Sequence, residues 1–439
     1  MTSLSPRTFA AICVFGALGC RGPASPQVPP AASVTVEVGR TGAALLGAAA
    51  SDSMVFAAIA SSSATTIEAR RGQTVAWERE LEGRGGPLAL SADGTALYAA
   101  LGGTDTIAGG AVRGEPGAAI VAIDAATGTV TWRVALDAAG WVTIGATAAL
   151  PDGGVLVGGT YTGGLRAGPH TVGAAGRNDG FVVAIRGTGE VAWLVRMGGV
   201  FADSVQGVAA QKTGDKTRIA IAGTFQVTAD LQGAQLPIFD ERSPLPDAFV
   251  AELDASGARV WSQAYGGRLL DSVAGVAIDR AGKVVVAGTS SGELHVGGLD
   301  LIAQGPSDGV LSWWNADGSP HHAILVGGQD FDGFRAIVAA GPSVVAGGFY
   351  SGSMSLGGQT LTAGGGDEAF LAAFDPTGSV HETWIVGGPG REELASLAPI
   401  RGGFVASVGY TAAADLAGTR VAAPADPMSG AAVLVRGVR

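Results

Sequence analysis

The chain has 439 residues, a formal net charge of −11 at pH 7 and a pI near 4.9, which excludes a protein that binds nucleic acid mainly through phosphate contacts. Hydrophobic residues make up 47% of the chain, which excludes disorder, and its 72 glycines follow no collagen period. Frequent glycine with many short apolar runs is typical of an all-β protein rich in turns.

The N-terminus carries one basic residue, Arg7, before an apolar stretch from Phe9 to Gly19 that is too short for a mature transmembrane helix. The stretch leads into Ala17-Leu18-Gly19-Cys20, which resembles the bacterial lipobox. The resemblance implies that residues 1–20 are a lipoprotein signal peptide and that Cys20 carries the lipid. An ordinary secretory signal with incidental cysteines is the alternative. Cys13 would leave with the signal, so we expect no disulfide in the mature chain.

Residues 21–32 are rich in proline and predict an extended tether between the anchor and a domain that covers 33–439. Arg21 stands where the resemblance to proteobacterial sorting signals associates Asp with retention in the inner membrane. We therefore expect an outer-membrane lipoprotein of a Gram-negative bacterium. The sequence leaves open whether the domain faces the periplasm or the cell surface.

A repeat dominates the domain. Segments beginning "DGFVVAI" at Asp179, "DAFVAEL" at Asp247 and "DGVLSWW" at Asp308 each lead through a turn glycine to a Gly-Gly pair. The turn glycines recur about every 60 residues, which fits four-stranded propeller blades with an extra hairpin. They are Gly128, Gly189, Gly257, Gly318 and Gly378.

Small residues fill the first strand of each blade, and the last strands carry bulky residues because blades crowd at the axis and separate outward. The expected peripheral tryptophans are Trp77, Trp132, Trp193, Trp261 and Trp384. First strands are expected near Ala44, Gly86, Ile144, Ser204, Ser272, Phe334 and Glu393. The last blade lacks a strand, and "SVTVEVG" at residues 33–39 is expected to supply it. We predict an all-β, seven-bladed β-propeller closed by this N-terminal strand.

The block "DAFVAELDASGARVW" followed by Gly-Gly, "DSVAGVA" and "VVVAGT" resembles the bacterial β-propeller repeats called SBBP. The resemblance covers roughly residues 118 to 428 and implies an extracytoplasmic protein. One blade, "AIDAATGTVTW" at Ala122 to Trp132, also resembles quinoprotein-type repeats. That type occurs in quinone-dependent dehydrogenases and in the propeller lipoprotein of outer-membrane protein assembly.

Gly288-Thr289-Ser290-Ser291-Gly292 matches the G-x-S-x-G pattern of serine hydrolases. A nucleophile elbow needs a strand, a sharp turn and a helix, whereas another hairpin-like alternation follows Ser290. Counting from Gly159, Gly223, Gly288 and Gly347, the equivalent residues are Tyr161, Phe225, Ser290 and Phe349. We therefore interpret Ser290 as a packing residue.

Four acids stand four residues after each Gly-Gly pair, at the expected start of an innermost strand: Asp203, Asp271, Asp332 and Glu392. One interpretation is a carboxylate-lined rim that holds a cation. The favoured interpretation is structural, with short acids accepting backbone N–H bonds where the chain passes between blades. The five histidines show no H-x-x-x-H spacing, so we predict no metal site from them.

The insert from Pro237 to Pro246 lengthens one repeat, and its residues Phe239, Asp240, Glu241 and Arg242 are a candidate binding loop or a functionless extension. We expect a non-catalytic, monomeric binding or scaffold module with no cofactor, a membrane attachment through Cys20 and a protein or glycan partner. Two alternatives stay open. One is a propeller enzyme such as a hydrolase, lyase or quinone-dependent dehydrogenase, and the other is a periplasmic partner in outer-membrane assembly.

Overall fold

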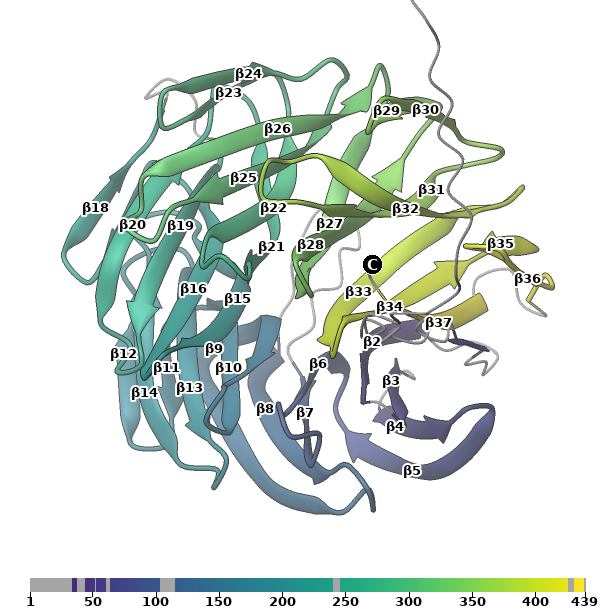
Figure 1. Cartoon of the computed structure of the whole chain (residues 1–439). Coiled ribbons are helices and arrows are strands. Elements are labelled where there is room, and N and C mark those ends of the chain that lie inside the picture. The colour runs from purple at the N-terminus through teal and green to yellow at the C-terminus, as the bar shows by residue number, and fades with distance from the viewer. Residues whose placement is uncertain are drawn as a thin grey trace, which may run out of the picture. The chain divides into compact units, whose positions relative to one another are not determined.

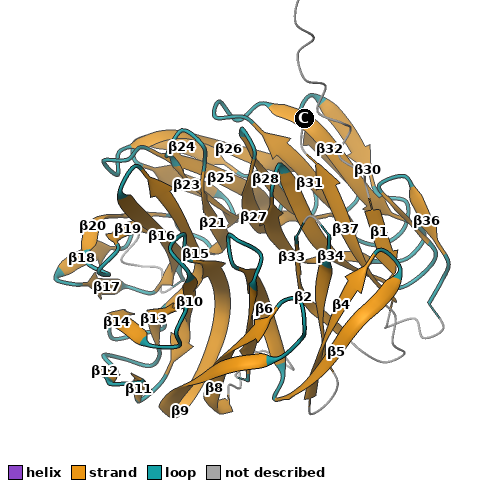
Figure 2. Cartoon of the chain, turned by 60° about the horizontal axis from the view of Figure 1, so that its bottom comes forward, coloured by secondary structure: helices purple, strands orange, loops and turns teal. Residues whose placement is uncertain are grey.

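The structure is a computed structural model, and it describes residues 34–37, 44–51, 53–60, 64–102, 115–239, 245–424 and 430–437. These residues form strands, turns and loops without a helix, as Figure 2 shows. Accordingly, none of the described segments is a helix able to span a bilayer. Ala32–Arg439 is one compact unit that holds every strand.

Most strands belong to four-stranded antiparallel units, each named here after its innermost strand (Figure 1). The β2 unit contains β2 (Ala44–Ala50), β3 (Val55–Ala60), β4 (Ala64–Arg71) and β5 (Thr74–Glu82). The β6 unit contains β6 (Gly85–Leu90), β7 (Ala96–Leu101), β8 (Glu115–Asp124) and the first part of β9 (Val130–Ala149). The β9 unit contains the rest of β9, then β10 (Gly154–Tyr161), β13 (Asp179–Arg186) and β14 (Val191–Met197).

The remaining units repeat this order. The β15 unit contains β15 (Ser204–Thr213), β16 (Lys216–Phe225), β19 (Asp247–Asp254) and β20 (Arg259–Tyr265). The β21 unit contains β21 (Asp271–Ile278), β22 (Val284–Ser290), β25 (Asp308–Trp314) and β26 (Pro320–Gly328). The β27 unit contains β27 (Asp332–Ala340), β28 (Ser343–Tyr350), β31 (Glu368–Phe374) and β32 (Val380–Gly387). The β33 unit contains β33 (Glu392–Ile400), β34 (Gly403–Tyr410), β37 (Gly430–Gly437) and β1 (Val34–Glu37).

Five hairpins connect the second and third strands of successive units from β9 onward. They are β11 (Gly164–Ala167) with β12 (His170–Gly173), β17 (Thr228–Leu231) with β18 (Ala234–Pro237), β23 (Glu293–Val296) with β24 (Leu299–Ile302), β29 (Ser353–Leu356) with β30 (Gln359–Thr362), and β35 (Ala414–Leu416) with β36 (Thr419–Val421). Each hairpin makes bridges to the outermost strand of the preceding unit or to the glycine after it, as β29 does with β26 and β35 with β32. The hairpins therefore link neighbouring units at their outer edges.

The units radiate from a centre where their innermost strands contact one another in chain order, β2 to β6, β9, β15, β21, β27 and β33. Strand β33 also contacts β2. The hydrophobic core is divided among these interfaces, because each buried cluster joins residues from two neighbouring units. Both faces of each sheet are buried, which explains the continuous apolar runs in the sequence.

The predicted all-β propeller architecture is confirmed, and the innermost strands begin within two residues of the expected positions except at Ile144. There the sequence predicts two strands, but β9 runs unbroken from Val130 to Ala149 and serves two units. Its continuity replaces the loop present at the other connections.

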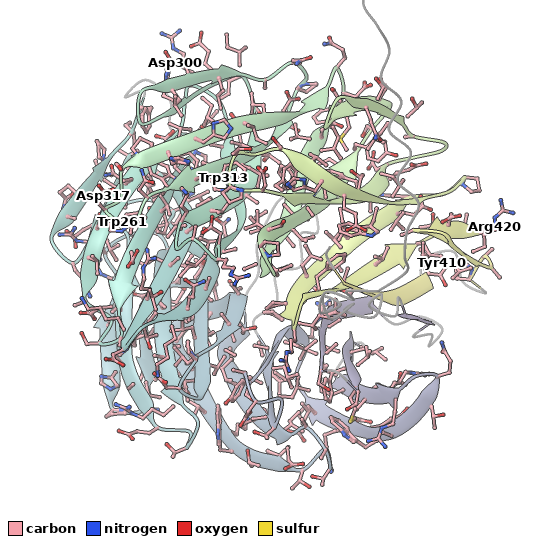
Figure 3. The ribbon with its side chains drawn as sticks, viewed as in Figure 1. Trp261, Asp300, Trp313, Asp317, Tyr410 and Arg420 are labelled. Atoms are coloured by element: carbon pink, nitrogen blue, oxygen red, sulfur yellow. The ribbon has the colours of Figure 1, made fainter. Side chains whose placement is uncertain are left out.

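The predicted tryptophans lie on outermost strands. Four of them, Trp77, Trp132, Trp193 and Trp261, pack under a turn of the next unit, whereas Trp384 lies edge to face with Phe404, ring centroids 4.9 Å apart. Trp261 contacts the turn at Gly318, and its Nε1–H donates to the Ala316 carbonyl (3.1 Å), beside Asp317 in Figure 3. Trp77, Trp132 and Trp193 make the same hydrogen bond to the next turn, at 2.8–3.0 Å. In the β21 unit His322 takes this place and faces Gly378.

Candidate functional site

Ser290 is fully buried at the end of β22, between Asp271 on β21 and Asp308 on β25 in the strand register. The strand is followed by a bend and the β23–β24 hairpin, so the helix of a nucleophile elbow is absent from this described segment. Ser290 thus has neither the exposure nor the local fold of a catalytic serine.

The structure corrects one equivalent of Ser290. A Cβ at Gly348 would lie 1.8 Å from the Gly333 carbonyl, just as one at Gly288 would lie 1.9 Å from the Ser272 carbonyl. Gly348, not Gly347, is therefore the matching glycine, and the equivalent residue is Tyr350 rather than Phe349. Tyr350 pairs with Asp332 and Glu368 as Ser290 pairs with its two acids.

The aromatic side chain missing at Ser290 is replaced from the neighbouring unit. At other interfaces the aromatic residue shares a buried cluster with a smaller residue that precedes the Gly-Gly pair: Phe225 with Met197, Tyr350 with Val326, and Tyr410 with Val386. At the interface of Ser290 the residue before the Gly-Gly pair is Tyr265, which is buried with its ring 5.7 Å from that of Trp314. The large residue has moved across the interface, which gives Ser290 a packing explanation.

The four candidate acids lie where the sequence predicts, at the start of the innermost strands. Each has a second acid 24 residues earlier, at the start of a third strand, which the sequence analysis did not single out as a site. The pairs are Asp179 with Asp203, Asp247 with Asp271, Asp308 with Asp332, and Glu368 with Glu392. All eight side chains are at most 5% exposed, so they lie inside the connections between units rather than on an open rim.

Backbone amides hold most of these acids. Asp203 accepts from the N–H groups of Gly199 (2.7 Å) and Gln226 (3.3 Å), and Asp332 accepts equivalently from Gly328 (2.6 Å) and Ser351 (3.3 Å). The partner acids use the same offset, since Asp179, Asp308 and Glu368 each accept from the residue four positions earlier. This is the capping role that the structural interpretation predicts.

The Gly-Gly pair belongs to the same arrangement. A Cβ on the first glycine would meet the acid on the third strand, at 2.1 Å between Gly266 and Asp247 Oδ1. A Cβ on the second would meet the hairpin of the next unit, at 2.0 Å between Gly328 and the Ser353 carbonyl. We call the segment from the Gly-Gly pair to the following acid a junction, and its glycines are required by close backbone approach.

Burial raises the pKa of the innermost-strand acids far above the usual range, and the neighbouring acid raises it further. The pKa values are about 7 for Asp203, Asp271 and Glu392, and about 6 for Asp332. The carboxylate oxygens of Asp271 and Glu392 have no well-aligned hydrogen bond, although the Ser290 hydroxyl and the Gly267 amide partly lower the pKa of Asp271, and the Gly388 amide partly lowers that of Glu392. The described residues include no cluster of three or more His, Cys, Asp or Glu side chains placed to hold a metal ion.

The candidate loop lies only partly within the described residues. Phe239 is partly exposed, stacks on His295 with ring centroids 6.2 Å apart, and donates its N–H to Asp247 Oδ2. Asp240, Glu241 and Arg242 of the same candidate loop lie outside the described residues, as does Cys20.

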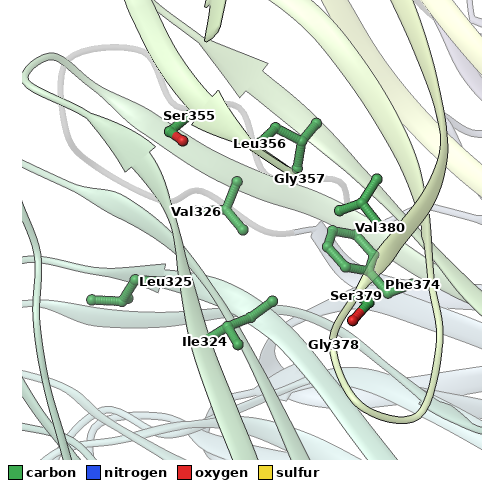
Figure 4. Close-up of a pocket in the computed structure, with 10 residues that line it drawn as sticks. All are labelled: Ile324, Leu325, Val326, Ser355, Leu356, Gly357, Phe374, Gly378, Ser379 and Val380. Atoms are coloured by element: carbon green, nitrogen blue, oxygen red, sulfur yellow. The ribbon is translucent and has the colours of Figure 1, made fainter. Parts of the chain in front are cut away.

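A groove of about 410 Å³ lies between β26, the β29–β30 turn and the β31–β32 turn (Figure 4). Ile324, Leu356, Phe374 and Val380 line it beside two serines, and its exposed lining is about equally polar and apolar. It adjoins Gly378, where His322 replaces the outer tryptophan. None of its ten lining residues is ionisable, so the groove offers no acid–base chemistry.

Exposed apolar side chains on the junctions are a feature that the sequence analysis missed. Val200, Phe201, Leu269, Leu270 and Phe331 are 46–69% exposed, and each lies between a Gly-Gly pair and its acid. We call these five residues the apolar rim. The Gly-Gly-to-acid motif itself locates the rim in the sequence, once the junctions are known to lie at the surface.

Radial four-stranded sheets, each passing from its outermost strand to the innermost strand of the next, define a β-propeller. No family model and no curated protein matches the chain. Among solved structures it is similar to Kuenenia stuttgartiensis hydrazine synthase, with a TM-score of 0.50, 10% identity, and coverage of 84% of this chain and 94% of that one. This likeness concerns the fold alone.

Two further solved structures show weaker similarity. The match to the Dos1 propeller has a TM-score of 0.46 at 9% identity, and it covers 93% of this chain and 96% of the Dos1 chain. The match to the propeller domain of Cps50 (Swd1) from Myceliophteria thermophila has a TM-score of 0.42 at 11% identity, and it covers 92% of this chain and 98% of the Cps50 chain.

Proposed function

We propose that this chain is a non-catalytic binding or scaffold module: a seven-bladed β-propeller, residues 33–439, that a lipid on Cys20 holds in the envelope of a Gram-negative bacterium. In this proposal residues 1–20 are the signal peptide, residues 21–32 are the tether and the protein belongs with the SBBP-type repeats. The observation that carries the binding role is the apolar rim, because the fold leaves these side chains uncovered.

The proposed blade number and closure are supported by contacts between strands. Seven innermost strands contact one another in succession, and the last contacts the first. Strand β1 pairs with β37 from Val34 opposite Val435 to Glu37 opposite Ala432. The N-terminal strand thus stands where the other units carry their outermost strand.

Photo-crosslinking in cells tests the binding role. A photoreactive amino acid at Leu270, on the apolar rim, is expected to form a defined adduct with a lipid, protein or glycan. The matched position is Val260, which is equally exposed but lies on the outer strand β20. Equal crosslinking at both positions, or none at either, would contradict a binding role for the rim.

Lipid labelling tests the anchor separately. With a clickable fatty-acid analogue, the chain should become labelled and the Cys20→Ala variant should not. Label that persists in Cys20→Ala would contradict the assignment of the anchor.

A further inference from the structure

The exposed apolar side chains are concentrated at one end of the sheets. Among the described residues, twelve large apolar side chains are exposed, and five of them form the apolar rim. Two more, Phe239 and Leu245, belong to the insert. The insert lies beside the junction that carries Leu269 and Leu270, because the Asp271 N–H donates to the Pro246 carbonyl. The other five lie on outer strands or hairpins: Val75, Val130, Val260, Leu299 and Ile302.

The opposite end of the sheets is charged, and its turns carry basic as well as acidic residues, among them Arg71, Lys212, Lys216, Arg280, Lys283 and Arg401. Its turns carry Asp93, Asp124, Asp254, Asp317 and Asp375. Side-chain and backbone hydrogen bonds from the same turns lower the pKa of these carboxyls, so they stay ionised at neutral pH. One end therefore exposes apolar side chains and the other exposes charged ones.

The backbone below the apolar rim is fixed by hydrogen bonds. The Leu270 carbonyl accepts from the Ser291 N–H, and the Phe331 carbonyl accepts equivalently from the Ser351 N–H, both at 3.1 Å. The Phe201 carbonyl accepts from the Asn178 N–H at 3.4 Å. Because the loops are already ordered, inserting their side chains into a partner costs little conformational entropy.

The arrangement of the rim favours a lipid surface as its occupant. The side chains project from three successive junctions at one end of the sheets, so a bilayer plane can receive them together. Leu and Phe side chains are those that enter the boundary between headgroups and acyl chains. The charged side chains of the opposite end favour water, which orients the rim toward the bilayer.

The tether allows this orientation. Residues 21–33 separate Cys20 from β1, and thirteen extended residues reach about 45 Å. A strand of eight residues, such as β22 with its next residue, spans only about 27 Å. The tether can therefore pass along the full length of a sheet to either end.

We propose that the apolar rim rests on a lipid bilayer and that Phe201, Leu270 and Phe331 enter its interfacial region. This inference deepens the proposed function, because it names the partner of the same rim and adds a second membrane contact to the lipid on Cys20. Two weak attachments together hold a protein at a membrane more firmly than either alone.

Vesicle flotation tests the proposal with Ala32–Arg439, the compact unit that lacks Cys20, so the result does not depend on lipidation. Vesicles of phosphatidylethanolamine with phosphatidylglycerol should bind this chain. The triple variant Phe201→Ser, Leu270→Ser, Phe331→Ser should lose at least about tenfold in partition coefficient. The matched control, Val75→Ser, Val130→Ser, Val260→Ser, removes three apolar side chains from outer strands and should bind like the parent chain.

A second measurement avoids variants that fail to fold. Cys13 and Cys20 are the two cysteines of the sequence, so Ala32–Arg439 has none and a single introduced cysteine labels one site. A polarity-sensitive dye on Leu270→Cys should shift to shorter emission wavelength with vesicles, and the same dye on Val260→Cys should not. Absence of binding by the parent chain, or equal shifts at both sites, would overturn the proposal. So would rim-dependent self-association without vesicle binding, which would make the rim an interface between copies.

Discussion

Ser290 shows how one residue acquires its role from its neighbours. In other units its position holds an aromatic ring, and the residue before the opposing Gly-Gly pair is smaller. Here the sizes are exchanged, with Tyr265 filling the interface from the other side. The serine is thus a consequence of packing, and chemistry at this position would need an exposure that it does not have.

Restoring the aromatic ring at Ser290 should therefore overfill the interface. We expect Ser290→Tyr to lower the free energy of unfolding by about 1–3 kcal/mol and Tyr265→Val to lower it by about 2–5 kcal/mol. The double variant should be more stable than the sum of the two losses predicts, because it recreates the pairing of Tyr350 with Val326. Urea unfolding of the parent chain, the two single variants and the double variant gives the coupling free energy between the two positions. If the loss in the double variant equals the sum of the two single losses, the exchange of side-chain size between Ser290 and Tyr265 is contradicted.

The sequence allowed part of this residue-scale result to be predicted. The aromatic column indicated that Ser290 is a packing residue, but a shift of one position selected Phe349 instead of Tyr350. The role of Tyr265 could not be predicted, because it lies on the outermost strand of the preceding unit, and packing across an interface between sheets depends on the tertiary fold. The buried partners of the candidate acids, Asp179, Asp247, Asp308 and Glu368, were visible as repeat positions, yet their pairing depends on tertiary contact.

At the scale of elements, the junction explains why Gly-Gly and an acid recur together. The glycines allow the third-strand acid and the next hairpin to approach the backbone. At two junctions the amide of the second glycine also donates a hydrogen bond to the innermost-strand acid, from Gly199 to Asp203 and from Gly328 to Asp332. Each junction therefore joins an outermost strand, a hairpin and an innermost strand at one point.

A methyl group at the junction should break this contact. We expect Gly328→Ala to destabilise the fold by at least about 2 kcal/mol, because its Cβ would meet the Ser353 backbone and not a movable side chain. Gly173→Ala is the matched control, since no atom lies within 4 Å of its Cβ position. Thermal unfolding should show a clear fall in Tm for the first and little change for the second. A similar Tm for both variants would contradict the role of the junction.

The buried acids predict an unusual dependence of stability on pH. Their pKa values in the folded state, about 6 to 7, lie above those of unfolded Asp and Glu, so the folded state binds more protons in this range. Their contribution to stability is full below about pH 4 and is lost as the pH rises through 6 to 7. Each carboxyl should change the free energy of unfolding by up to about 1.4 kcal/mol per pH unit.

The measurement is the free energy of unfolding in urea between pH 5 and 8, which should fall with rising pH. Asp203→Asn keeps the shape of the side chain without its titration, so its curve should be flatter than that of the parent chain. Parallel curves would show that Asp203 does not titrate in this range.

The strands themselves were predictable because apolar runs and turn residues mark them. The continuity of β9 was not, since no loop signal distinguishes an unbroken strand from two strands in line. The β9 strand makes the β6 and β9 units one nine-stranded sheet.

At the scale of the whole molecule, the N-terminal strand β1 completes the β33 unit beside the C-terminal strand β37. The sequence predicts from a missing strand that this segment closes a ring of seven blades, and that closure stays a prediction. The apolar rim could not be predicted in the same way, because composition does not reveal which apolar residues a fold leaves exposed.

A disulfide across this pairing should stabilise the protein if β1 closes the ring. We expect Val36→Cys with Val433→Cys, or the adjacent pair Thr35→Cys with Leu434→Cys, to raise the free energy of unfolding by about 2–4 kcal/mol on oxidation. The reduced form of each variant is its own control. Equal Tm values for the oxidised and reduced forms of both would contradict closure.

The place of β1 also has a mechanical consequence. A pull on the N-terminus is transmitted first to the short ladder between β1 and β37, four residue pairs long. When this force runs along the strands, the ladder bonds share the load in shear instead of opening one after another. In a chain anchored by its N-terminus, this ladder is the first element to bear tension, and its rupture would separate the two ends of the chain.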